Sequence, residues 1–174
     1  MTAAQRRDEI LQALAGASGP VSAAALAARL GVSRQVVVGD VALLRAAGSP
    51  IVATPRGYVL GGGQEGSGVR CTVACRHGLD GLLDELYTVA DCGCGVLDVT
   101  VEHPVYGQLS GQLQVFSRYD ADVFWDALQK NGAQPLCSLT GDIHLHTLVC
   151  PDEARKARVL AALEEKGYLM GLEK

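Results

Sequence analysis

The chain has 174 residues, of which 48% are hydrophobic and 20% charged, and its formal net charge is −4. This balance supplies enough apolar surface for one large or two small cores and excludes a wholly disordered chain. No apolar run approaches the roughly 18 residues that cross a bilayer, and the charged N-terminus is unlike a secretory signal. We therefore expect a cytoplasmic protein with no membrane partner.

The charge is divided unevenly along the chain. Residues 1–60 carry a formal charge of +3, whereas the remainder carries −7. Between them, residues 61–68 (GGGQEGSG) contain five glycines and no apolar side chain, which predicts a flexible linker. The sequence thus predicts a basic domain over 1–60 and an acidic one over 69–174. Nucleic-acid affinity confined to one domain requires such a division.

Three short helices are predicted ahead of the linker. The first spans residues 3–15; Ser22 caps a second over 23–30, and Ser33 caps a third over 34–48. The turn between the second and third helices has three residues and begins with a glycine. This spacing is typical of a helix-turn-helix, whose second helix enters the major groove of DNA.

The third helix has one apolar side and one side for DNA. Val37, Val41 and Leu44 share the side expected in the core. The residues expected to read DNA bases are Ser33, Arg34 and Gln35. Gly39 lies inside the helix, where glycine costs about 1 kcal/mol relative to alanine, and one explanation is close approach of the DNA backbone.

A hairpin follows the third helix. Residues 51–54 and 58–60 read as two strands joined by a Pro-Arg-Gly turn. Arg56 at its tip is placed to reach a phosphate or the minor groove. Three helices and a hairpin also build domains that bind no DNA. The combination of caps, tight turn, hairpin and positive charge favours a DNA-binding unit.

The run LAARLGVSRQVVVGDVALLRAAG, followed by IVATPRGYVL, resembles the winged helix-turn-helix of biotin-repressor-type regulators. The resemblance covers about residues 5–60. It implies that the hairpin is a wing and that the partner of this domain is operator DNA.

Strands and helices alternate after the linker. The predicted strands are 69–76, 95–102, 107–115 and 142–149, and the predicted helices are 79–91, 120–130 and 152–166. Without the last helix, the order β-α-β-β-α-β is that of a ferredoxin-like sandwich. The predicted fold class is therefore α+β in two domains.

All four histidines fall in this second domain. His144 and His146 are two apart on a predicted strand, so both imidazoles point to one face at a separation that a single metal ion spans. The alternative is two histidines on a solvent face. His77 and Glu85 can face the same pocket if the chain turns at Gly78. Three imidazoles and a carboxylate suit nickel, zinc, iron or manganese.

His103 and the six cysteines have weaker assignments. His103 lies in the turn EHPVYG and is expected, with Tyr106, to contact a ligand or form hydrogen bonds rather than bind the metal. The cysteines are expected to be free thiols. A thiolate from Cys75, Cys92 or Cys94 would compete for a soft ion, although small apolar packing residues are the favoured interpretation.

The segments RHGLDGLLDELY, DVTVEHPVYGQLSGQL, SLTGDIHLHTLVCPDE and LEEKGYLM resemble the 3H domain. A winged helix-turn-helix joined to a 3H domain is similar to the niacin-responsive repressors of NAD biosynthesis and niacin uptake genes. The resemblance implies a homodimer, nicotinic acid as co-repressor, and a divalent metal, nickel or zinc first among the candidates. The implied metal ligands are His77, Glu85, His144 and His146.

Two other functions remain open at this point. One is a metal-dependent hydrolase fused to a DNA-binding domain, because three ligands and an open position activate water. The other is a regulator whose effector is the metal itself.

Overall fold

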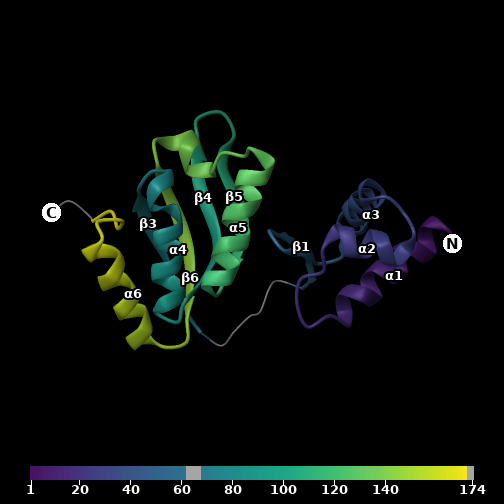
Figure 1. Cartoon of the computed structure of the whole chain (residues 1–174), viewed down its shortest axis with the longest axis horizontal. Coiled ribbons are helices and arrows are strands. Elements are labelled where there is room, and N and C mark those ends of the chain that lie inside the picture. Colours follow the sequence, from purple (N-terminus) through teal and green to yellow (C-terminus); the bar gives the residue numbers. More distant parts are fainter. Residues whose placement is uncertain (62–67, 172–174) are drawn as a thin grey trace. The chain divides into compact units, whose positions relative to one another are not determined.

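The computed structural model describes residues 1–61 and 68–171 and divides into two compact units, Met1–Glu65 and Gly66–Lys174 (Figure 1). Each unit is described by itself. The linker predicted over 61–68 lies largely outside the described residues. Within those residues, no helix is both long and apolar enough to cross a membrane.

The first unit contains the expected three helices and hairpin. Its elements are α1 (Ala3–Ala15), α2 (Ala23–Leu30), α3 (Arg34–Ala46), β1 (Ile51–Thr54) and β2 (Gly57–Leu60). Ser22 and Ser33 cap α2 and α3 by accepting hydrogen bonds from backbone N–H groups three residues on. Gly31 ends α2 in the left-handed conformation, with φ of 65°. The predicted helix-turn-helix is therefore confirmed, with α3 ending two residues early.

The core of the first unit lies between its three helices. Its largest members are Ile10, Leu14, Leu26, Leu30, Val37, Val41, Leu44 and Ile51. Asp40 of α3 is also buried, and its carboxylate pairs with the guanidinium of Arg6 on α1. Arg7 lies 3.6 Å from the same carboxylate. Two arginines counted in the positive charge of this unit thus face inward and orient α3.

The hairpin is tied to the loop before α2. Val21 and Tyr58 exchange backbone hydrogen bonds of 2.9 Å in both directions. The backbones approach so closely that a Cβ on Gly57, whose φ is 139°, would lie 2.4 Å from the carbonyl oxygen of Val21. Glycine is therefore required there, and it fixes the turn that carries Arg56.

The second unit has the predicted β-α-β-β-α-β order and an added C-terminal helix. Its elements are β3 (Val69–Arg76), η1 (Leu79–Gly81), α4 (Leu82–Asp91), β4 (Gly95–His103), β5 (Gly107–Val115), α5 (Arg118–Asn131), η2 (Leu136–Thr140), β6 (Ile143–Cys150) and α6 (Glu153–Glu165). The helix predicted over 79–91 begins as the 3-10 helix η1, and η2 is an addition that the hydrophobic pattern does not predict.

The sheet has the order β3-β6-β4-β5, and every neighbouring pair is antiparallel. β6 thus lies between β3 and β4, which run in the same direction and are connected through α4. Alternate residues of β6 are buried, because α4, α5 and α6 cover one face of the sheet (Figure 1). The α+β fold class is confirmed.

The expectation that all six cysteines are free thiols is wrong for one pair. Cys94 and Cys150 form a disulfide across 56 residues of sequence. The reason is strand register: Gly95 pairs with Val149, so the adjacent cysteines meet where β4 begins and β6 ends. The other four cysteines are free.

Candidate metal centre and DNA interface

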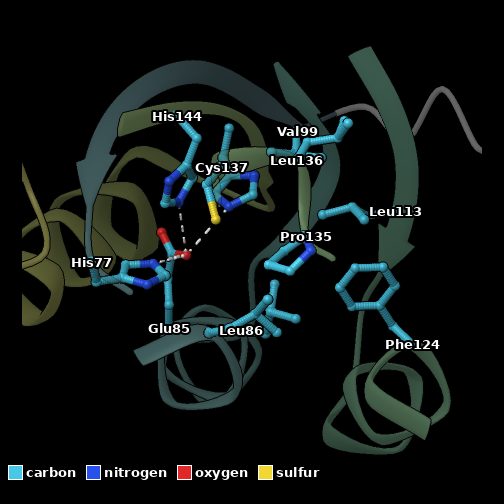
Figure 2. Close-up of a pocket in the computed structure, with 12 residues that line it drawn as sticks. His77, Glu85, Leu86, Val99, Leu113, Phe124, Pro135, Leu136, Cys137 and His144 are labelled. Atoms are coloured by element: carbon cyan, nitrogen blue, oxygen red, sulfur yellow. Dashed lines mark hydrogen bonds and ion pairs between the residues drawn. The ribbon is translucent and has the colours of Figure 1, made fainter. Parts of the chain in front are cut away.

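The four predicted metal ligands converge on one buried point, and Figure 2 shows three of them, His77, Glu85 and His144, directed toward one another. The Oε2 atom of Glu85 lies 2.6 Å from Nε2 of His77 and 3.3 Å from Nε2 of both His144 and His146. Glu85, His144 and His146 are each less than 4% exposed. The structure therefore brings together every residue predicted for the metal.

Local structure explains how the four side chains meet. His144 and His146 occupy the buried face of β6, as their two-residue spacing requires. His77 follows the end of β3, and Glu85 lies in the first turn of α4. The chain turns between them at η1, where a Cβ on Gly81 would lie only 2.9 Å from the His77 side chain. Gly81 thus makes room for the imidazole, a role that the sequence pattern did not reveal.

The outer nitrogen of each imidazole is held by a backbone carbonyl. Nδ1 donates to the oxygen of Gly78 in His77 (2.9 Å), of Asp142 in His144 (3.0 Å) and of Asp98 in His146 (2.7 Å). Because a carbonyl only accepts, Nδ1 carries the proton, and in the neutral ring the lone pair of Nε2 points at the centre. This is how metal-binding histidines are oriented by their surroundings.

Two backbone irregularities place these carbonyl groups. The pairing of β4 with both neighbours shifts register between Val96 and Asp98, which marks a β-bulge beside His146. Asp142 has a φ of 69°, which is uncommon for a residue with a side chain. Neither Asp98 nor Asp142 was predicted from the sequence, because the spacing of hydrophobic residues reveals neither a β-bulge nor a left-handed backbone conformation.

Without a cation, the centre is electrostatically incomplete. Glu85 Oε1 is buried with no hydrogen-bond partner among the described residues, and a neutral imidazole offers the carboxylate no proton at Nε2. Either protons or a metal ion must therefore lie between the three nitrogens and the oxygen. The donor set of three nitrogens and one carboxylate fits a divalent transition metal.

The ionisation of the cluster follows the same reasoning. Burial raises the pKa of Glu85, but the charge of His146 and the hydrogen bonds of the three histidines outweigh it and hold the pKa well below its ordinary value. Burial lowers the pKa of His77 and of His146, but the interactions of each with Glu85 outweigh burial, so both pKa values are raised above the ordinary histidine value. In the metal-free protein, the Glu85 carboxylate and the imidazoles of His77 and His146 thus each favour the charged form of the other.

A narrow cavity opens beside this cluster. Figure 2 shows His77, Glu85 and His144 on one side of it and Leu113, Pro135 and Phe124 on the other. The remaining lining residues are Leu82, Leu86, Val99, Leu136, Cys137 and His146. An apolar slot that ends in a polar cluster suits a small flat molecule with one anionic group.

The C-terminal segment closes another side of the centre. Leu169 forms a bridge with Cys75 at the edge of β3, and the ring of Tyr168 lies 4.9 Å from that of His77. The Tyr168 hydroxyl donates to Asp84 at 2.8 Å. Burial first, and then Asp84, raise the pKa of Tyr168 to about 12, so this hydroxyl is a donor at neutral pH.

His103 and Tyr106 lie elsewhere. They occupy the β4–β5 turn, where Tyr106 is 74% exposed and His103 Nδ1 accepts hydrogen bonds from the backbone of Val105 and Tyr106. Neither residue lines the cavity. The structure thus gives His103 a role in its own turn and does not place this pair with the metal ligands.

The residues predicted to contact DNA lie at the surface of the first unit. Ser33, Arg34 and Gln35 are exposed in the first turn of α3, and Arg56 is half-buried in the hairpin turn. The Ser33 oxygen accepts from the Val36 N–H at 3.3 Å, which leaves its hydroxyl proton for a partner. Their contacts with DNA stay a prediction.

Comparison with known proteins matches both units. The 3H domain matches residues 70–172 and a helix-turn-helix domain matches residues 6–59. The probable transcription repressor NiaR of Thermotoga maritima is 43% identical, over 95% of this chain and 94% of that protein. The transcription repressor NadR of Bacillus subtilis is 40% identical, over 96% and 94%.

These relatives are repressors with a DNA-binding domain, and the match extends over nearly the whole of each chain. The chain is accordingly a DNA-binding regulator of transcription rather than an enzyme. It belongs to the 3H-domain family of helix-turn-helix repressors, the niacin-responsive repressor family that the sequence motifs predict.

Proposed function

We propose that this protein represses genes of NAD biosynthesis and niacin uptake, and that nicotinic acid is its co-repressor. The observation that carries the proposal is the apolar cavity that ends at the His77–Glu85–His144–His146 cluster. In this proposal the cluster holds a divalent metal, nickel or zinc first and iron or manganese after them. The effector occupies the cavity beside it.

The chemistry of nicotinic acid matches the two ends of the cavity. Its flat pyridine ring would lie among Leu86, Val99, Leu113 and Phe124 once these side chains move apart, and they would shield the ring faces from water. Its carboxylate would meet the cluster. A divalent ion held there would supply the positive charge that attracts this anion.

The DNA-binding part of the proposal depends on symmetry. We propose a homodimer whose two α3 helices enter successive major grooves. Ser33, Arg34 and Gln35 of each helix would contact the bases, and Arg56 of each hairpin would contact the DNA backbone. Half-sites would then lie about one helical turn, or a multiple of it, apart. The names of the two relatives, both transcription repressors, support operator DNA as the partner.

The test is operator binding by the full-length, metal-loaded protein. Operator DNA is first selected from a random pool in the presence of nicotinic acid, and fluorescence anisotropy then gives the affinity with and without the effector. We expect nicotinic acid to tighten binding by about 5–150-fold, the usual range of allosteric coupling. Nicotinamide is the matched control, because it keeps the ring but lacks the carboxylate.

Unchanged affinity with every pyridine carboxylate would overturn the proposed effector. Repetition after chelation separates the metal-sensing alternative. A pure metal sensor would lose operator binding on chelation and ignore nicotinic acid at every metal concentration.

A further inference from the structure

One residue beside the metal centre is not among the four predicted ligands. Cys75 lies on β3, directly opposite His144 in the strand register, and its side chain is fully buried. Directly opposite residues of antiparallel strands place their Cβ atoms about 4.5–5.5 Å apart on the same face. The register therefore turns Cys75 towards the centre from the strand next to β6.

The donor atoms lie close enough for one ion. The Sγ of Cys75, a carboxylate oxygen of Glu85 and a ring nitrogen of His144 are all within 4.8 Å of one another. Bonds of roughly 2.3 Å to sulfur and 2.0–2.1 Å to nitrogen bring such atoms to a shared ion after small side-chain movements. Within the described parts of the chain, no other cysteine belongs to a group with this spacing.

A second observation concerns the carboxylate of Glu85, which lies next to the Cys75 thiol. Glu85 is 1% exposed, and its Oε1 atom has no hydrogen-bond partner among the described residues. A buried carboxylate oxygen without a partner has lost its hydration and gained no hydrogen bond in return, which destabilises the folded protein. The unpartnered oxygen and the nearby thiol thus point to an ion position shared by both.

We propose that Cys75 is a thiolate ligand of the metal, in addition to His77, Glu85, His144 and His146. This inference rests on the proposed function, which supplies the metal. A soft sulfur donor favours borderline ions such as zinc, nickel or cobalt over manganese, which prefers oxygen ligands. On binding, the thiol loses its proton to solvent and its sulfur donates an electron pair to the ion.

The test uses the full-length chain, stripped of metal and reloaded with Co²⁺. In the wild type we expect a sulfur-to-cobalt charge-transfer band in the near ultraviolet beside the weaker visible bands of bound cobalt. In Cys75→Ser the charge-transfer band should be lost while the visible bands remain. Cys137→Ser is the matched control, because Cys137 lines the same cavity and is also buried; it should keep the band.

The outcomes separate this inference from the proposed function. Cobalt bound by the wild type without a charge-transfer band would overturn the thiolate ligand and leave the metal site standing. Loss of the band in Cys137→Ser would also overturn it. Failure to bind Co²⁺, Zn²⁺ or Ni²⁺ at all would instead reject the metal in the proposed function. X-ray absorption of the zinc-loaded wild type gives a second reading that needs no variant, with one sulfur expected at about 2.3 Å.

Discussion

The two units differ in where they place their functional polar residues. In the first unit the candidate DNA contacts stand at the surface of one short helix and one turn, so a few consecutive residues define them. In the second unit the polar cluster is buried and assembled from the end of β3, from α4 and from β6. Glu85 and His146 alone are 61 residues apart in sequence. Local order is enough for the first function, whereas the second depends on strand register.

We expect substitutions in the buried cluster to abolish metal binding by the second unit without unfolding the first. In His144→Ala/His146→Ala, two of the three nitrogen ligands are removed, so affinity for zinc or nickel should fall by more than the roughly 10–100-fold seen when supporting residues are changed. The helices of the first unit should remain folded, because the cores are separate. Metal content by mass spectrometry and helix content by circular dichroism give the readouts.

His103→Ala is the control for the double variant. His103 is a histidine of the same unit that lies outside the cluster, so this variant should retain metal at the wild-type level. Metal occupancy unchanged in His144→Ala/His146→Ala would refute the assigned site.

A matching experiment on the first unit changes a residue predicted to contact DNA and leaves the metal ligands intact. Arg34→Ala should weaken operator binding by about 1–3 kcal/mol if the side chain contacts a base, while metal content stays constant. Arg158→Ala removes the same charge from the exposed surface of α6 in the other unit. Equal losses in the two variants, measured by anisotropy at one salt concentration, would show that Arg34 contributes only net charge.

Titration of the cluster should give opposite pH dependences with and without metal. His77 and His146 have raised pKa values in the metal-free protein, so their stabilising contribution is present below the ordinary histidine value of about 6.5 and is lost as pH rises through the raised values. The lowered pKa of Glu85 keeps its carboxylate ionised throughout this window.

A bound metal competes with protons for the same nitrogens, so its contribution grows as pH rises. The Tm with excess chelator should therefore fall from pH 6 to pH 8, relative to the Tm of the metal-loaded protein. Parallel curves for the two forms would contradict the assigned protonation of the cluster.

The smallest expected effect is at Gly39, where one substitution tests stability and DNA binding separately. A Cβ added to Gly39 would meet no atom within 4 Å, so Gly39→Ala should raise the free energy of unfolding by about 1 kcal/mol. If the DNA backbone passes close to this residue, the same change should weaken operator binding. A variant with raised Tm and unchanged operator affinity would remove that explanation for the glycine.

The same contrast explains what the sequence predicted well. Caps, glycines and short periodic runs are local, so the helix-turn-helix, the hairpin and the element order of the second unit were predicted closely. The pair His144 and His146 was recognisable from strand alternation alone, and the family resemblance joined it to His77 and Glu85.

The remaining features depend on contacts between distant segments. The β-bulge at Asp98, the Cys94–Cys150 disulfide and the contact of Tyr168 with His77 require the strand order β3-β6-β4-β5, which the element order does not determine. Cys75 was favoured as a packing residue, because its pairing with His144 appears only once β3 and β6 are in register.

The central claim is that the buried cavity of the second unit controls the DNA affinity of the first. Thermodynamic linkage makes this control reciprocal. The most direct measurement is calorimetric titration of nicotinic acid into the metal-loaded, full-length protein, free and saturated with operator DNA. The account predicts that DNA tightens nicotinic acid binding by the same factor by which nicotinic acid tightens DNA binding. Equal nicotinic acid affinities in the two titrations would contradict it.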